Sequence, residues 1–167
     1  KENEKPYVTV LNDEKSIIEK FCSIVGEENP DILFGYNSSN FDIPYLKARA
    51  DSLNIKFSLS DGNADMRKIK KGMVTGMSVP GRIHVDLYPM VRFFGFIGLI
   101  KAQQFTLEKI YEEVMGKKKL MVNRRNIWEM WDHNEIDELA EYSMNDAVIT
   151  KELGENYLAL EMELSNL

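Results

Sequence analysis

One stretch decides the fold: Ile32-Leu33-Phe34-Gly35-Tyr36-Asn37-Ser38-Ser39-Asn40-Phe41-Asp42. Its first five residues form a continuous apolar run, which is typical of a strand covered on both faces. A polar turn follows at 37–40, and the apolar residues then recur at helical spacing, at Ile43, Leu46, Ala50 and Leu53. The stretch therefore predicts a buried central strand that turns directly into a helix.

The preceding residues extend the same alternation. Tyr7 to Leu11 reads as a short strand, and Asn12 or Asp13 can cap a following helix that ends near Gly26. The apolar stripe of that helix consists of Ile17, Ile18, Phe21 and Val25. The order strand, helix, strand, helix predicts an α/β fold with a parallel sheet.

The second half of the chain changes character. Helical spacing is lost between residues 54 and 85, where glycines and β-favouring residues predict a β-hairpin insertion at about 56–80. Beyond Val91 we expect mainly helices. One runs from Thr106 to Met115 and is closed by Gly116, and a long one runs from Ile136 to the C-terminus.

Length and composition limit the class of protein. The 167 residues, 44% of them hydrophobic, suffice for one domain. The net charge of −6 argues against a protein that binds duplex DNA by electrostatic attraction alone. The longest apolar run is too short to cross a bilayer, and the N-terminal residues of the chain as given show no secretory signal, so we expect a cytoplasmic protein without a membrane partner. The single cysteine, Cys22, excludes an internal disulfide and is expected in the core.

Three segments carry residues suited to chemistry. Asp42 follows the predicted central strand, and α/β sheets place ligand sites beyond the carboxyl ends of their strands. Asp42 could equally cap the helix, with Asn37 serving only the turn. Tyr142 and Asp146 lie four apart on the long helix and so share one face, although such pairs are also common on solvated helices.

The third segment, Gly81 to Tyr88, alternates like a half-buried strand. His84 could act as a ligand or base, or as a structural histidine hydrogen-bonded beside Asp86, and Asp86 could instead cap the next helix. Basic clusters that could approach phosphates, or simply face solvent, stand at Arg67-Lys68-Lys70-Lys71, Lys117-Lys118-Lys119 and Arg124-Arg125.

In this order, the three segments closely resemble the 3′→5′ proofreading exonuclease domain of family B DNA polymerases, especially those of archaea. The resemblance covers nearly the whole chain and implies a ribonuclease H-like α/β fold: a mixed sheet flanked by helices, with a β-hairpin insertion that touches DNA. Residues 37–42 resemble the second exonuclease motif of the family, and Tyr142 with Asp146 resembles the third.

The resemblance implies hydrolysis of the 3′-terminal phosphodiester of single-stranded or frayed DNA by two-metal catalysis with Mg²⁺ or Mn²⁺. Asp42 and Asp146 become metal ligands, Tyr142 orients the attacking water, and Asn37 and Phe41 bind the terminal nucleotide. Implied partners are DNA, the remaining polymerase domains and, through the parent protein, a sliding clamp. The implied location is cytoplasmic, with the nucleoid.

The chain departs from the family pattern in one respect: it contains no Asp-x-Glu, the first exonuclease motif. We therefore expect residues 1–167 to form a single partial domain, truncated at the N-terminus and lacking its first central strand or strands. Such a fragment should be weakly active or inactive by itself. The alternatives are a free-standing nuclease of the same carboxylate type, and a degenerate exonuclease fold kept as a DNA-binding or interaction scaffold.

Overall fold

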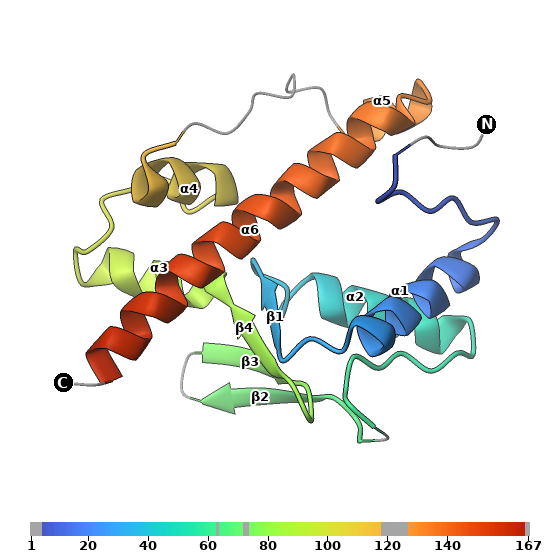
Figure 1. Ribbon diagram of the computed structural model, residues 1–167, viewed down its shortest axis with the longest axis horizontal. Helices are drawn as coiled ribbons and strands as arrows, with labels where there is room; N and C mark the ends of the chain where they lie inside the picture. The colour runs from blue at the N-terminus through green and yellow to red at the C-terminus, as the bar shows by residue number, and fades with distance from the viewer. Residues whose placement is uncertain (1–4, 63, 72–73, 118–126, 166–167) are drawn as a thin grey trace. The chain divides into compact units, whose positions relative to one another are not determined.

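The computed structural model describes residues 5–62, 64–71, 74–117 and 127–165 (Figure 1). The chain divides into two compact units, residues 1–86 and 87–167. The first contains α1 (Glu14–Glu28), β1 (Ile32–Gly35), α2 (Asp42–Ser52), β2 (Arg67–Lys71), β3 (Val74–Ser78) and β4 (Ile83–Asp86). The second contains α3 (Leu87–Phe96), α4 (Leu107–Met115), α5 (Ile127–Asp132) and α6 (Ile136–Ser165).

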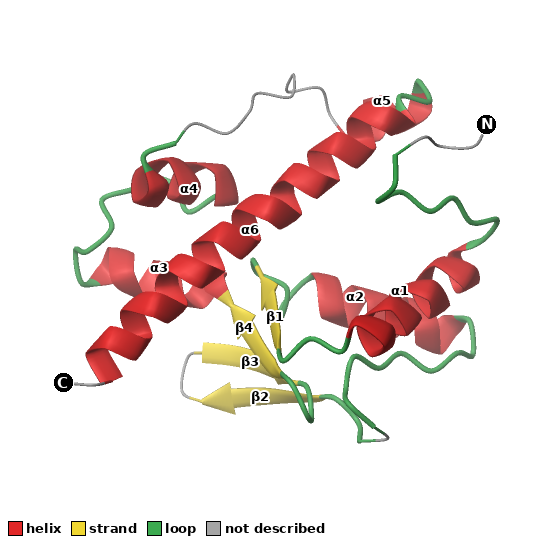
Figure 2. Cartoon of the chain, viewed as in Figure 1, coloured by secondary structure: helices red, strands yellow, loops and turns green. Residues whose placement is uncertain are grey.

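Strands β1 and β4 lie side by side and run parallel (Figure 2). Their register places Ile32 opposite Ile83 and Gly35 opposite Asp86. Parallel strands need a long crossover, and here α2 and the β2–β3 hairpin lie within it. This arrangement confirms the predicted α/β class. The residues of β1 are half-buried rather than fully covered, and among the described residues β4 is the one strand that pairs with β1, so β1 is not the central strand that the sequence predicted.

The start of the chain differs from the sequence prediction. Residues 5–11 contain a turn, in which the Val8 N–H donates to the Lys5 carbonyl at 3.0 Å, and they include no strand. The prediction of a strand over Tyr7 to Leu11 is therefore wrong: β propensity alone does not form a strand unless a neighbouring strand supplies the hydrogen bonds.

Helix α1 begins as predicted but ends later. The Asp13 carboxylate caps it by accepting from the Ser16 N–H at 2.7 Å, and this bond lowers the pKa of Asp13. The helix continues past Gly26 to Glu28 because Asn29, not the glycine, adopts the left-handed conformation that ends it, with φ 45°.

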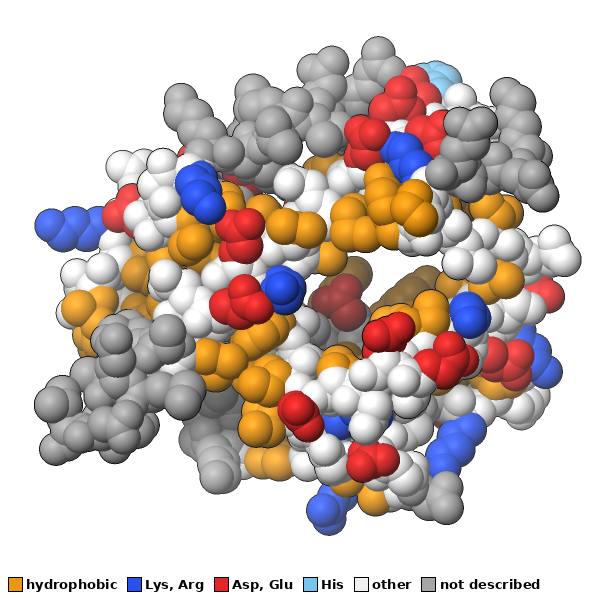
Figure 3. All heavy atoms as spheres, in the orientation of Figure 1, with side chains coloured by type: hydrophobic (Ala, Val, Ile, Leu, Met, Phe, Trp, Pro, Cys, Tyr) orange, Lys and Arg blue, Asp and Glu red, His pale blue; other side chains and the backbone are white. Residues whose placement is uncertain are grey.

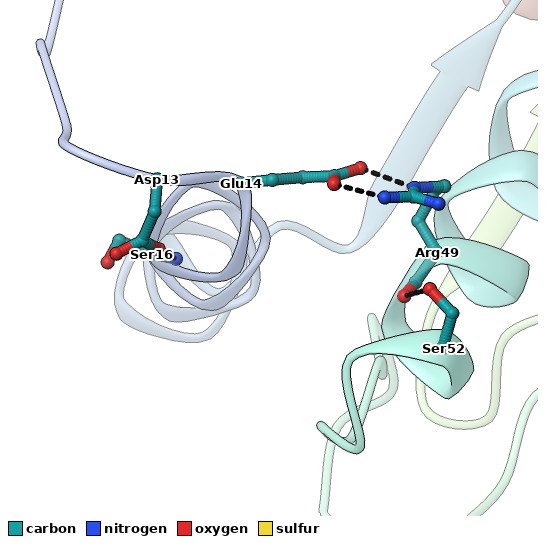
Figure 4. A network of polar contacts seen from close by, with 5 residues as sticks. All are labelled: Asp13, Glu14, Ser16, Arg49 and Ser52. Atoms are coloured by element: carbon teal, nitrogen blue, oxygen red, sulfur yellow. Dashed lines mark hydrogen bonds and ion pairs between the residues drawn. The ribbon is translucent and has the colours of Figure 1, made fainter.

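The core of the first unit joins α1, α2 and the segment that leads to the hairpin. Its buried members are Ile18, Val25, Ile43, Ala50, Phe57, Leu59 and Val79, and half-buried Cys22 packs against them. Helices α1 and α2 are also joined by the Glu14–Arg49 ion pair, whose Nε–Oε1 distance is 2.6 Å (Figure 4). Both side chains are about two-fifths exposed, so the pair adds little to stability.

The predicted insertion contains the expected hairpin. Strands β2 and β3 pair antiparallel, with Arg67 opposite Ser78. The chain leaves the hairpin through Arg82, whose guanidinium donates to the Leu59 carbonyl at 2.9 Å and the Pro30 carbonyl at 2.7 Å. These bonds attach the start of β4 to two other segments of the first unit.

In the second unit, α6 packs against α3, α4 and α5. The buried hydrophobic residues described in this unit are Leu87, Val91, Ile100, Ile110, Tyr111, Met130, Ile149, Leu153 and Tyr157. Helix α4 has the predicted limits, with Thr106 as N-cap and Gly116 as C-cap at φ 64°, and α6 confirms the predicted long helix. Burial raises the pKa of Tyr157 to about 12. None of the helices in the described residues is long and apolar enough to cross a membrane.

Neighbouring isoleucines on α1 offer a test of this packing. Ile18 is 2% exposed and Ile17 is 53% exposed. We expect Ile18→Ala to destabilise the chain by about 2–5 kcal/mol, because it removes buried methyl groups and leaves a cavity. The matched variant Ile17→Ala should change stability by no more than about 0.5 kcal/mol. Urea unfolding measures both, and equal losses would contradict this core assignment.

Candidate active site

The segment between β1 and α2 is a tight turn that presents Asp42 at its end. Asn37 adopts a left-handed conformation, with φ 63°, and its carbonyl accepts from the N–H groups of Asn40 at 3.2 Å and Phe41 at 3.1 Å. The Ser38 carbonyl then accepts from the Ile43 N–H at 3.0 Å. The turn is thus bonded directly to the first turn of α2.

Asp42 is the first residue of α2 and its side chain is exposed. Phe41 occupies the N-cap position and makes no side-chain capping bond. The alternative in which Asp42 caps the helix is therefore wrong: its carboxylate stands one position inside the helix, where the helix dipole still favours negative charge. The turn function of Asn37 is observed.

Exposed aromatic rings flank this carboxylate. Phe41 and Tyr45 are 66% and 57% exposed, and their rings stack with centroids 6.4 Å apart and an interplanar angle of 8°. The spacing of four residues places both on one side of the start of α2. Exposed, parallel rings are the kind of surface on which a nucleobase can stack.

Two side chains of β4 bind this turn from the neighbouring strand. The Asp86 carboxylate accepts from the Asn37 N–H at 2.7 Å and, through its other oxygen, from the Ser39 N–H at 2.9 Å. His84 Nε2 lies 2.9 Å from the Ser38 hydroxyl oxygen. Sequence reasoning missed this connection. The alternation of the segment placed His84 and Asp86 on one strand face, but which turn that face meets depends on the register of β1 and β4.

His84 is a hydrogen-bonded histidine beside Asp86, as the structural alternative predicted, with Ser38 as a partner. Burial lowers its pKa, and the nearby Asp86 charge and a hydrogen bond with the Met77 backbone oppose this shift. Gly35 completes the arrangement, because a Cβ there would lie 1.9 Å from the Ser38 hydroxyl oxygen.

In the second unit, Tyr142 and Asp146 line one cavity of about 380 Å³. Its other walls come from Gln104 and the start of α4, with Thr106, Leu107, Glu108 and Lys109. Both α6 residues are half-buried, so the predicted shared face is observed. Sequence reasoning did not anticipate the α4 residues, because their approach to α6 depends on helix packing.

The chemistry of these side chains fits a hard divalent cation. Carboxylate oxygens are the preferred ligands of Mg²⁺ and Mn²⁺. Asp42 belongs to the first unit and Asp146 to the second. Among the described residues, no group of three or more histidine, cysteine or acidic side chains is arranged to hold a metal ion.

Side chains of both charges lie on the surface of the described residues. On the face drawn in Figure 3, acidic and basic side chains are interspersed among hydrophobic ones. Arg67, Lys68 and Lys70 of the first predicted basic cluster are exposed on β2. Lys118, Lys119, Arg124 and Arg125 lie outside the described residues.

Comparison with known proteins supplies the family. The model of "DNA polymerase family B, exonuclease domain" matches residues 1–110. A DNA polymerase of Thermococcus sp. (strain 9oN-7) is 40% identical over 163 residues, which make up 97% of this chain and 20% of that polymerase. The DNA polymerase of Thermococcus gorgonarius is 39% identical over 163 residues, which again make up 97% of this chain and 20% of that polymerase.

A solved structure agrees with these sequence matches. The family B DNA polymerase from the hyperthermophilic archaeon Pyrobaculum calidifontis superposes with a TM-score of 0.74 at 29% identity, over 87% of this chain and 19% of that chain. The present chain thus spans about a fifth of the length of these relatives.

The lowered pKa of His84 generates a prediction on acid stability. Because its pKa in the folded chain lies below 6.5, the unfolded chain binds more protons as the pH falls through 6.5 towards the folded value, and stability declines. The melting temperature should therefore fall between about pH 7.5 and pH 5.5, and His84→Gln should reduce that fall. The control is His133→Gln at an exposed site, which should keep the wild-type profile. An unchanged profile in His84→Gln would contradict the assignment.

Proposed function

The chain belongs to the exonuclease domain of the family B DNA polymerases, and from this membership we propose that it removes 3′-terminal nucleotides from DNA as part of a DNA polymerase. The family match over residues 1–110 carries the proposal. The exposed carboxylate of Asp42 supports it, because Asp42 stands beyond the carboxyl end of β1, where α/β folds bind their substrates.

We assign the metal-binding roles to Asp42 and Asp146. Their oxygen ligands suit Mg²⁺ or Mn²⁺, and two such ions, when bound, activate water and stabilise charge on the phosphate and the leaving oxygen. The complete ligand set would need further carboxylates, because Asp42 and Asp146 are only two residues and the sequence contains no Asp-x-Glu.

The remaining roles concern water and substrate. Tyr142 lines the same cavity as Asp146, so its hydroxyl can orient a water molecule held near that carboxylate. Phe41 offers an exposed ring, stacked on Tyr45, to the terminal base. Asn37 stands at the start of the same turn, four residues before Phe41, and would hydrogen-bond to the terminal nucleotide.

The parent protein would supply the rest of the activity. The relatives are named DNA polymerases and are about five times as long, so we expect polymerase domains as intramolecular partners and a frayed or single-stranded 3′ end as substrate. A sliding clamp would be a partner of the whole protein. We expect the protein in the cytoplasm with the nucleoid, since DNA is its substrate.

The test is Mn²⁺-dependent digestion of a 5′-labelled single-stranded oligonucleotide by the complete polypeptide to which residues 1–167 belong. Asp42→Ala and Asp146→Ala should each reduce the rate by at least about 100-fold. Even the loss of a residue that hydrogen-bonds to a metal ligand lowers metal affinity or activity by about 10–100-fold. Removing either carboxylate removes a proposed metal ligand outright. The rate of mononucleotide release is the measurement.

Exposed acidic residues on the same helices serve as controls. Asp51→Ala on α2 and Glu155→Ala on α6 remove a carboxylate that pairs with a surface lysine, and both should digest DNA at the wild-type rate. If the wild type itself does not digest the oligonucleotide, the scaffold alternative is favoured, in which the fold binds DNA or a protein without catalysis.

The hairpin offers a separate prediction. Lys68 and Lys70 project from the same side of β2 and are exposed. The slope of log affinity against log salt concentration is negative for such binding. If both lysines contact phosphates, the double variant Lys68→Gln/Lys70→Gln should make this slope less negative by roughly 1.4 for single-stranded DNA. The same charge change at Lys15 and Lys20 on α1 is the control and should leave the slope unaltered. Fluorescence anisotropy over a salt series measures both.

A further inference from the structure

We propose that Asp86 is a positioning residue of the exonuclease site, because its carboxylate holds the turn that presents Asn37 and Asp42. The inference deepens the proposed function and rests on it. Asp86 ends β4, a strand that carries none of the residues assigned above to metal or substrate. Its contribution would act through the backbone of the 37–39 turn.

The first step of the argument is the geometry of the contact. One carboxylate oxygen of Asp86 lies 2.7 Å from the Asn37 nitrogen and the other lies 2.9 Å from the Ser39 nitrogen. Both donors belong to one turn, so the carboxylate fixes the turn in orientation as well as position. Hydrogen bonds to an ionised acceptor are shorter and about twice as strong as neutral ones.

The second step leads from the turn to the proposed metal ligand. The Ser38 carbonyl, between the two N–H groups that Asp86 binds, accepts from the Ile43 N–H at 3.0 Å. Ile43 follows Asp42 directly, and its side chain is buried in the core. A shift of the turn would therefore displace the first turn of α2, and with it the Asp42 carboxylate.

The third step is that the turn has little space in which to rearrange. Ser38 and Ser39 are 8% and 0% exposed. Ser38 packs against Gly35, the residue that faces Asp86 in the register of β1 and β4, and its hydroxyl is held by His84. Asp86 therefore acts on a closely packed element, in which a lost acceptor would force a displacement.

The carboxylate chemistry explains the choice of the variant. Asp86→Asn keeps the size of the side chain but replaces one acceptor oxygen by an NH₂ group, which faces a backbone N–H and repels it. Asp86→Glu keeps both acceptor oxygens and lengthens the side chain by one methylene group. A positioning role of the carboxylate predicts that Glu restores more activity than Asn.

The experiment uses the complete polypeptide, with exonuclease and polymerase activity measured on the same preparations, well below the melting temperature. Asp86→Asn should lower exonuclease kcat about 10–100-fold and raise the Mn²⁺ concentration for half-maximal activity. Loss of groups that orient metal ligands has effects of this size at other metal sites. The KM for DNA should change little, and polymerase activity should stay at the wild-type level. Asp31→Asn, an exposed carboxylate next to the start of β1, is the matched control and should behave as wild type.

Each outcome decides between the proposals. Wild-type kcat and Mn²⁺ dependence in Asp86→Asn, with Asp42→Ala inactive, would overturn the positioning role alone and leave the proposed function standing. Equal digestion by the wild type and Asp42→Ala would overturn the proposed function, and the inference with it. If Asp86→Asn loses polymerase activity through misfolding, Asp86→Glu decides. This variant keeps both acceptor oxygens, so its exonuclease kcat and Mn²⁺ dependence should stay close to those of the wild type. Loss of its exonuclease activity while polymerase activity is intact would contradict the role.

Discussion

The parallel pairing of β1 with β4 is the constraint on which the first unit depends. Its register sets Gly35 opposite Asp86, at the point where β1 ends and the turn to α2 begins. Only this register brings a β4 carboxylate within 2.7–2.9 Å of two backbone N–H groups of that turn. A slip by one residue would turn Asp86 to the other face of the pair and leave both donors without it.

The turn contains polar groups that a purely structural loop would avoid. Ser39 is fully buried, and among the described residues its hydroxyl has no hydrogen-bond partner. An unsatisfied buried hydroxyl costs about 1–3 kcal/mol, so the segment is less stable than an apolar residue there could make it. Bonds to the Asp86 carboxylate offset part of this cost. The conformation immediately before Asp42 is therefore held by the bonds of the turn backbone to Asp86, whereas the Ser39 hydroxyl lowers the stability of the segment.

Several features could be predicted from the sequence because they depend on local patterns. The helices after Asp13 and Thr106, the hairpin and the α/β alternation follow from caps, glycines and apolar spacing, and the order of the three segments sufficed to predict the family. The contact of Asp86 with the turn joins residues 47 and 49 positions apart, so no local pattern encodes it. The strand assigned to Tyr7 to Leu11 was wrong for the same reason, since a strand is defined by its partner.

Helix α6 combines packing and proposed chemistry in one stripe. Tyr142, Asp146, Ile149, Leu153 and Tyr157 follow one another at intervals of three or four residues and so lie on one face. The last three are buried among the helices of the second unit, whereas Tyr142 and Asp146 line the cavity beside α4. Because a helix is stiff over these four turns, the apolar end of the stripe sets the rotation of the polar end. The orientation of Asp146 towards its cavity is therefore a consequence of how Ile149 and Leu153 are packed.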